Sequence, residues 1–159
     1  MAGHPSRKLA VLLHADVVGS TELVQRDESL AHERIQDSFR RFSETIKAYG
    51  GITQELRGDA LVAEFARASD AVTAAIAFQI ENTDSSTRLE DDIQPQLRIG
   101  ISLGEVIVAD NTVTGAGIVL AQRLEQLAEP GGGVVVQGSV SETVPRRLPL
   151  ISTVLVSKH

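Results

Sequence analysis

The chain has 159 residues, which supports one well-buried core and is short for two domains. A formal net charge of −6 argues against a general nucleic-acid binder, and the lack of cysteine excludes disulfides, thiolate zinc sites and cysteine nucleophiles. No apolar run reaches membrane-spanning length and no secretion-signal core is visible, so we expect a cytoplasmic domain without a membrane span.

The first third of the chain predicts a strand followed by two helical segments. Residues 1–8 are polar and are interpreted as a flexible leader, and residues 9–159 as a single domain. The apolar run 9–13 is typical of a strand buried on both faces. A short helix then begins near residue 20, and residues 27–29 cap a longer helix with apolar residues at helical spacing that ends at Ala48.

The next segment predicts a hairpin and a second helix. Residues 52–56 alternate apolar and polar side chains, residues 57–59 supply a turn, and residues 60–65 return as a more buried strand. An alanine-rich helix follows over residues 68–81.

The second half repeats this order. We interpret residues 82–95 as a polar connection, residues 97–101 as a strand, Leu103-Gly104 as a turn and residues 105–109 as the returning strand. A helix over residues 116–128 follows, with its apolar stripe formed by Leu120, Leu124 and Leu127.

The remaining elements complete the predicted fold. They are a strand at residues 134–136, a short helix over 139–144 and a last strand within 151–156. Paired hairpins that alternate with crossover helices predict an α+β fold with a ferredoxin-like mixed sheet, a βαββαβ core with an extra hairpin and helix, and helices packed on the sheet.

Two acidic residues stand where predicted strands end. Asp16 follows the first strand and precedes a helix, and Asp59 lies at the tip of the first hairpin. Carboxylates brought together there can hold a divalent metal against a polyphosphate, and the amides of a helix N-terminus favour an anion. The ordinary alternatives are a helix cap for Asp16 and turn chemistry for Asp59.

Four segments taken together resemble the class III adenylate and guanylate cyclase catalytic domain, over about residues 9 to 144. They are Asp16-Val17-Val18-Gly19-Ser20-Thr21, the spacing from Gly50-Gly51 to Gly58-Asp59, the strand 98–106, and the helix 121–124 followed by Ala128-Glu129-Pro130-Gly131. Four motifs in the same order are far more specific than any one of them.

The resemblance implies a two-metal reaction on ATP or GTP. Two Mg²⁺ or Mn²⁺ ions would be held by Asp16 and Asp59 with the backbone carbonyl of Val17, and the ribose 3′-hydroxyl would attack the α-phosphorus with loss of pyrophosphate. The phosphates would lie on the main chain of Val18, Gly19, Ser20 and Thr21.

The resemblance also implies a homodimer with shared active sites. The family uses an arginine from the partner subunit to stabilise the transition state, and the matching residue is Arg123. Two equivalent sites would then form across a two-fold axis. The ordinary alternative is a surface arginine paired with Glu125 or Gln126.

Several positions depart from the family pattern. Val119 stands where the family has an asparagine that orients the ribose, and a valine donates no hydrogen bond. At the positions that contact the purine base, Glu55 matches the guanylate cyclases, whereas Thr112 can donate or accept a hydrogen bond and so favours neither purine. Glu55 can equally be a solvent-facing strand residue. The family's Leu-Lys-Gly element, which supplies a phosphate-binding lysine, has no counterpart around Lys158. Its lack suggests a domain that is truncated at the C-terminus.

Of three possible functions, we favour the first. The first is a nucleotidyl cyclase in intracellular signalling, and the second is a catalytically degenerate cyclase-like domain that binds nucleotide or regulates through dimerisation. The third keeps the two metals but performs hydrolysis or polymerase-like transfer, since fold alone does not fix the reaction. His14 shares a strand face with Asp16, but a lone strand histidine is more often packed than catalytic.

Overall fold

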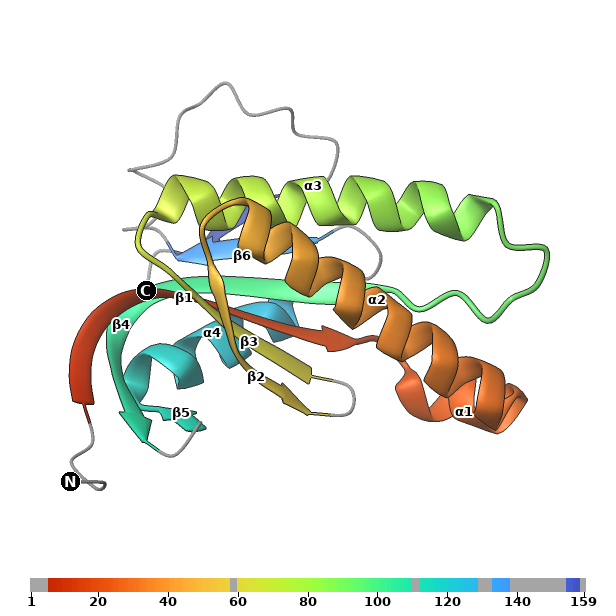
Figure 1. The fold of residues 1–159 in the computed structure, drawn as a ribbon, viewed down its shortest axis with the longest axis horizontal. Helices are drawn as coiled ribbons and strands as arrows, with labels where there is room; N and C mark the ends of the chain where they lie inside the picture. Colours follow the sequence, from red (N-terminus) through yellow and green to blue (C-terminus); the bar gives the residue numbers. More distant parts are fainter. Residues whose placement is uncertain (1–5, 58–59, 110–111, 129–132, 138–153, 158–159) are drawn as a thin grey trace.

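A computed structural model describes residues 6–57, 60–109, 112–128, 133–137 and 154–157. They form a mixed sheet of seven strands with helices on both faces, which confirms the predicted α+β fold (Figure 1). The strands are β1 (Ser6–Val17), β2 (Ile52–Arg57), β3 (Ala60–Phe65), β4 (Leu97–Ala109), β5 (Thr112–Thr114), β6 (Val134–Gln137) and β7 (Val154–Ser157). The helices are α1 (Ser20–Arg26), α2 (Glu28–Ala48), α3 (Ala68–Thr87) and α4 (Ala116–Leu127).

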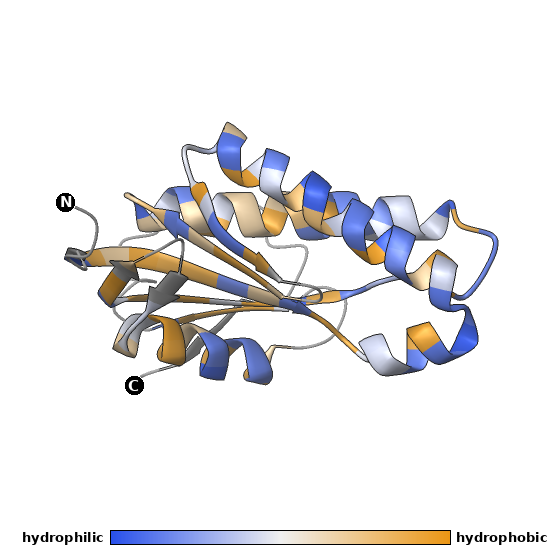
Figure 2. Ribbon diagram, turned by 60° about the horizontal axis from the view of Figure 1, so that its bottom comes forward, coloured by the Kyte–Doolittle hydropathy of each residue, from blue (hydrophilic) through white to orange (hydrophobic). Residues whose placement is uncertain are grey.

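The sheet has the strand order β2-β3-β1-β4-β6-β7, and β5 pairs with β4 outside this path. Strand β1 is antiparallel to both of its neighbours, whereas β4, β6 and β7 run parallel. Figure 2 shows α2 and α3 on one side of the strands and α4 on the other. We call these the α2/α3 face and the α4 face.

The alternation of side chains along β1 divides the core between these faces. Val11, Leu13 and Ala15 belong to the large apolar cluster that also contains residues of α2 and α3. Ala10 and Leu12 point the other way, into a smaller cluster with residues of α4. His14 and Asp16 continue this second series, so they lie on the α4 face.

The large cluster explains why α2 and α3 form where the sequence predicts them. Asp27 caps α2 by accepting a hydrogen bond from the Leu30 amide at 3.1 Å, as the predicted restart of the helix requires. The rings of Phe42 and Phe78 stack between the two helices with centroids 4.3 Å apart. This face therefore has the dense apolar packing that stabilises a domain.

The predicted end of α3 at residue 81 is wrong, because the helix continues to Thr87. The buried Asn82 side chain donates to the Pro95 carbonyl at 3.0 Å, so a polar residue serves as a core anchor there. Arg88 reaches back to Asp84, one turn earlier, at 2.9 Å. Residues 82–87 of the predicted connection therefore belong to the helix, and residues 88–96 form the connection to β4.

The predicted turn at Leu103-Gly104 is also wrong, because β4 is one strand of 13 residues. It pairs with β1 without interruption, from Val17 opposite Leu97 to Ser6 opposite Val108. Gly104 serves close packing instead: a Cβ there would lie 2.7 Å from the Cα of Gly117 in α4. The returning strand of the hairpin is the short β5.

The first strand begins earlier than the sequence predicts. Strand β1 begins at Ser6, so residues 6–8 of the segment interpreted as a leader pair with β4. The short helix predicted over residues 139–144 lies outside the described residues. None of the helices in the described part of the chain is long and apolar enough to cross a membrane.

Candidate active site

Helix α4 lies directly on the backbone of β4. A Cβ at Gly100 would come within 2.2 Å of the Ala121 carbonyl oxygen and 2.4 Å of the Glu125 amide nitrogen. Only a residue without a side chain allows this approach. The close contact brings Glu125 down to the sheet, next to the strand positions that flank Gly100.

Asp16 lies at the end of β1, opposite Arg98 of β4 and Ala60 of β3. About 25% of its side chain is exposed, and its Oδ1 lies 3.7 Å from the Nε of Arg98. That oxygen is buried and accepts no hydrogen bond from a described residue. Burial raises the pKa of Asp16 to about 7, with a further contribution from the neighbouring Glu125 carboxyl.

Four polar side chains meet between β1, β4 and α4; we call His14, Asp16, Arg98 and Glu125 the β1–α4 polar cluster. Gly100 lies opposite His14, and the Nδ1 of His14 lies 3.5 Å from Oε1 of Glu125, whose residue is 0% exposed. Each member has a buried nitrogen or oxygen without a hydrogen-bond partner among the described residues. Such atoms are rare in proteins and often mark functional positions.

The sequence-based reading missed two members of this cluster. Arg98 entered only as part of a strand motif, and Glu125 only as a surface partner for Arg123. Glu125 is buried beside Leu124 and one turn after Ala121, on the face of α4 that meets the sheet. The helical spacing of residues 118, 121 and 125 could have placed it there.

The loop after Asp16 leads into α1 at the surface. Gly19 adopts the left-handed conformation with φ of 61°, and no side chain caps the helix that follows. The Val18 amide donates to the Gln96 carbonyl at 2.8 Å, whereas Gly19 and Thr21 are exposed. The predicted phosphate-binding segment therefore lies next to Asp16 and is open to solvent.

A β-bulge places Glu55 on the same face as Asp16. The register between β2 and β3 shifts at Gln54, so Glu55 pairs with Val62, a member of the smaller cluster on the α4 face. Without the extra residue Glu55 would pair with Leu61 and point toward α2. Glu55 is partly buried, so it is not simply a solvent-facing strand residue.

Helix α4 presents Val119 and Arg123 away from its own sheet. Val119 is 44% exposed, and Arg123, one turn later, is also exposed. The predicted apolar stripe is wrong at Leu127, which is 60% exposed. The alternative in which Arg123 pairs with Glu125 at the surface is wrong too, because Glu125 is buried on the other side of the helix.

Part of the predicted site lies outside the described residues. Asp59 is not among them, so its convergence with Asp16 stays a prediction. The backbone of Thr112 pairs with Ala109 in β5, but its side chain is not described. Within the described ranges, no three His, Asp or Glu side chains are arranged to hold a metal. Asp16 fits as one ligand, since its Oδ1 is an acceptor that no described donor satisfies and its side chain is partly exposed.

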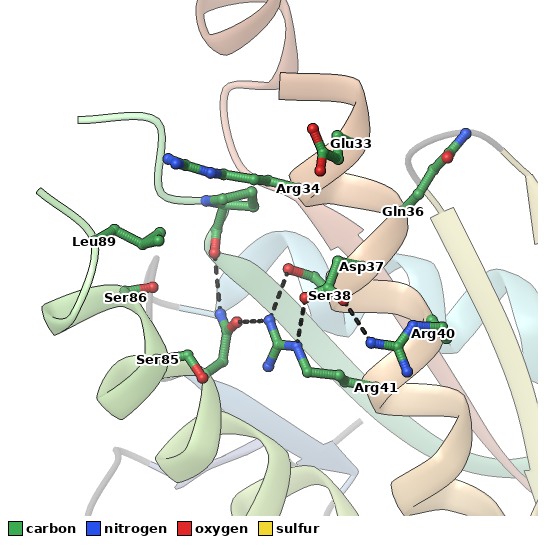
Figure 3. A pocket seen from close by; sticks show the side chains of 12 residues that line it. Glu33, Arg34, Gln36, Asp37, Ser38, Arg40, Arg41, Ser85, Ser86 and Leu89 are labelled. Carbon is green, nitrogen blue, oxygen red and sulfur yellow. Dashed lines mark hydrogen bonds and ion pairs between the residues drawn. The ribbon is translucent and has the colours of Figure 1, made fainter. Parts of the chain in front are cut away.

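A polar groove on the other side of the molecule is a weaker candidate. It has a volume of about 630 Å³ and lies between α2, α3 and the loop after α3 (Figure 3). Its cations are already paired: Arg34 with Asp91, and both Arg40 and Arg41 with Asp37. These pairings leave the groove without a free guanidinium among the described residues, so we place the candidate site on the α4 face, where Asp16 has an unsatisfied oxygen.

Comparison with known proteins identifies relatives of the whole described domain. A Rhizobium meliloti protein that carries the name of an adenylate cyclase is 35% identical over 136 residues, which cover 83% of this chain and 23% of that protein. An adenylate cyclase of Streptomyces coelicolor is 33% identical over 88% of this chain and 35% of its own length. The chain thus spans a quarter to a third of these relatives. No protein-family model matches it.

Solved structures support the same assignment. The adenylate/guanylate cyclase/hydrolase of Silicibacter pomeroyi superimposes with a TM-score of 0.80 and 28% identity, over 92% of this chain and 85% of that one. The mixed sheet and its helices are thus those of a nucleotidyl cyclase fold. With the similarity in sequence, the chain belongs to the class III adenylate/guanylate cyclase catalytic-domain family.

Proposed function

We propose that this domain is a nucleotidyl cyclase that converts ATP or GTP to the 3′,5′-cyclic monophosphate and pyrophosphate. The observation that carries the proposal is Asp16: a partly exposed carboxylate with an unsatisfied oxygen, next to an exposed loop and helix N-terminus, in a chain of this family. A carboxylate beside backbone amides suits a metal-bound polyphosphate.

Asp16 and Asp59 would hold two Mg²⁺ or Mn²⁺ ions, together with the Val17 carbonyl. The pairing of Asp16 with Ala60 supports this assignment, because Asp59 is bonded to Ala60. When bound, the metals would make the ribose 3′-hydroxyl more acidic and neutralise charge on the triphosphate. The amides from Val18 to Thr21 would orient the phosphates, and Glu55 with Thr112 would contact the base.

The exposure of Arg123 supports a shared site. Its helix faces its own sheet with Ala121 and Glu125, so Arg123 points outward, where a second subunit can present its Asp16. A two-fold homodimer would then contain two equivalent sites, each built from both subunits. The guanidinium would stabilise negative charge that develops on the phosphates.

The decisive experiment is complementation between two inactive variants. Asp16→Ala and Arg123→Ala should each lower the formation of cyclic product from a purine triphosphate with Mn²⁺ by at least about a hundredfold. Mixed in equal amounts, they should recover roughly a quarter of wild-type turnover, since half of the dimers would have one intact site of two. Recovery is measured by mass spectrometry, which also separates cyclic from hydrolysed products. Unchanged turnover in Asp16→Ala would reject the proposal.

Val119 favours one second candidate, a degenerate domain that binds nucleotide without turnover. The Val119 side chain is exposed one turn before Arg123, at a position from which an asparagine could donate a hydrogen bond. If the domain is a slow cyclase, Val119→Asn should raise turnover by about tenfold to a hundredfold. Saturable binding of Mn²⁺ and nucleotide with no product in either form would support the degenerate domain instead.

A further inference from the structure

The α3–β4 connection, residues 88–96, makes the contact that holds the start of the proposed phosphate-binding segment 18–21. The Gln96 carbonyl accepts a hydrogen bond from the Val18 amide at 2.8 Å, at the point where β1 has ended. Because this amide is already bonded within the chain, Val18 is the anchor of the segment. The position of the segment therefore depends on how the α3–β4 connection is held.

Arg34 of α2 binds this connection at two places, and Figure 3 shows its side chain extending from α2 toward it. Its Nη1 donates to the Ile93 carbonyl at 2.8 Å, its Nη2 donates to the Asp91 carboxylate at 2.8 Å, and Nη1 also contacts that carboxylate. The same carboxylate accepts from the Ile93 amide at 3.0 Å. The backbone of Ile93 is therefore held at its carbonyl by Arg34 and at its amide by the acid that Arg34 binds.

Few soft torsions separate Ile93 from the bond to Val18. The Ile93 side chain is buried in the large apolar cluster, and the Gln96 carbonyl meets Val18 only three residues later. Between them, Pro95 has a fixed φ and restricts the residue before it, and its carbonyl accepts from the Asn82 side chain at 3.0 Å. The direction of the Gln96 carbonyl is therefore set from α3 through Asn82 and from α2 through the contacts of Ile93.

The chemistry of arginine suits this contact. A planar guanidinium can bind a carboxylate with two N–H groups and still donate to a carbonyl, whereas a lysine ammonium lacks this fixed geometry. The Arg34 side chain is 20% exposed, so its contacts are partly shielded from water. Arg26 of α1 pairs with the adjacent acid, Asp92, at 3.4 Å, but 51% of its side chain is exposed. Since exposed pairs contribute little, the connection should depend on Arg34 far more than on Arg26.

We propose that Arg34 is a positioning residue, which holds residues 91–93 so that the Gln96 carbonyl keeps the Val18 amide and the segment 18–21 in place. Its consequence for nucleotide rests on the proposed function, which assigns this segment to the phosphates. Without Arg34, binding must also order the segment, so affinity for nucleotide falls. The phosphates are held both before and during the reaction, so the KM should rise by about tenfold while kcat stays within about threefold.

Hydrogen exchange of single amides, followed by NMR, tests the positioning role without nucleotide or metal. In Arg34→Ala the Val18 amide should exchange at least about tenfold faster than in the wild type, because its acceptor is no longer held. The amide of Leu13, a fully buried residue of the same strand, reports the change in global stability. The increase at Val18 should exceed that at Leu13 by at least about fivefold. Equal factors at the two amides would show a role in stability alone and overturn the proposal.

Two further variants test why the contact works. Arg26→Ala removes the exposed pair with Asp92 on the same connection, so it should leave exchange at Val18 within about twofold of the wild type. Arg34→Lys keeps the charge without the two-point contact, so exchange at Val18 should stay at least about fivefold above the wild type. An effect of Arg26→Ala as large as that of Arg34→Ala overturns the proposal, as does wild-type exchange in Arg34→Lys.

Binding of nucleotide separates this inference from the proposed function. The probe is Mn²⁺ with a 3′-deoxy purine triphosphate, which lacks the attacking hydroxyl. Its Kd by calorimetry should rise about tenfold in Arg34→Ala and less than about twofold in Arg26→Ala. An unchanged Kd in Arg34→Ala, despite faster exchange at Val18, overturns the consequence for nucleotide binding. If the wild type does not bind the probe, the proposed function fails, whereas exchange at Val18 still decides the positioning role.

Discussion

Strand β1 contributes apolar residues to one face of the sheet and both apolar and polar residues to the other. On the α2/α3 face, β1 contributes Val11, Leu13 and Ala15 to a large apolar cluster, and the charged residues above it are paired at the surface. On the α4 face, β1 contributes Ala10 and Leu12 to a small cluster and then His14 and Asp16 to the β1–α4 polar cluster. Four of the six buried side-chain atoms without a hydrogen-bond partner among the described residues belong to this cluster, and the other two belong to Ser43 of α2 and Gln79 of α3.

The difference indicates that the α2/α3 face stabilises the fold, and the proposed function assigns the chemistry to the α4 face. Apolar burial and paired charges lower the free energy of the folded state, whereas buried unsatisfied polar atoms raise it. A domain can retain such atoms where the rest of the core compensates, and functional sites are the usual places. Changes on the α2/α3 face should therefore reduce stability, and changes on the α4 face should alter turnover.

Phe42→Ala should have the largest effect on stability. The ring is fully buried and stacks on Phe78, so its removal should lower the free energy of unfolding by about 3–5 kcal/mol. Urea denaturation measures this loss. Turnover per folded molecule should stay within about twofold, because the ring lies on the face opposite Asp16. A large loss of turnover at temperatures where the variant is folded would contradict the division between faces.

Asp16→Asn should instead stabilise the metal-free domain above neutral pH. The pKa of Asp16 rises from 3.8 to about 7 on folding, so the folded state holds a proton that the unfolded state has lost between these values. The stability associated with this proton is present below about pH 4 and is lost as pH rises through about 7. Asparagine imitates the protonated form at every pH.

The full shift corresponds to about 4 kcal/mol. Because solvent reaches a quarter of the side chain, we expect a gain on the order of 2 kcal/mol at about pH 8 and little change at about pH 4. Urea denaturation with a chelator present measures the difference. Turnover should be lost in the same variant. If Asp16→Asn had a lower free energy of unfolding than the wild type at alkaline pH, the ionised Asp16 carboxylate would not destabilise the folded domain.

Gly100→Ala should disturb both properties. The new Cβ would meet the backbone of α4 at 2.2 Å, so the helix must move off β4 at a cost of about 1–3 kcal/mol. The shift also displaces Glu125 and Arg123, so turnover per folded molecule should fall by about tenfold or more. Ala71→Ser in the α3 core is a suitable control, since its polar atom lowers stability without touching α4. Equal turnover per folded molecule in Gly100→Ala and Ala71→Ser would contradict the view that the packing of α4 on Gly100 positions Arg123.

The sequence predicted the parts of the fold that local chemistry decides. Asp27 caps α2, the apolar periodicity of α2 is buried as expected, and β2 and β3 pair antiparallel as the predicted hairpin requires. Gly104 misled the prediction because a glycine in a strand can mean a turn or a close approach, and only the position of α4 decides between them. Asn82 misled it because its partner, Pro95, is distant in sequence.

The site was predictable where a motif stands next to a strand end, and less so where it depends on packing. Asp16 lies at a strand end before an exposed loop, as the sequence predicts, and Val119 and Arg123 are on the exposed side of α4, but their roles stay predictions. The burial of Glu125 was not predicted, because a single glutamate on a helix is usually exposed. Its burial follows from the contact of α4 with Gly100, a pairing across 25 residues that no local pattern encodes.

The smallest expected effect is that of Asp37→Asn, which tests the opposite sign on the α2/α3 face. Hydrogen bonds from Arg40 and Arg41 lower the pKa of Asp37, so its stabilising contribution is present above the unfolded value of about 3.8 and is lost as pH falls through the lower folded value. Its side chain is 47% exposed, so the loss near neutral pH should be below about 1 kcal/mol. Urea denaturation should show this loss at about pH 7 and a smaller loss at about pH 3, below the unfolded value. If Asp37→Asn and Asp16→Asn shifted stability in the same direction at neutral pH, paired and unsatisfied acids would not distinguish the two faces.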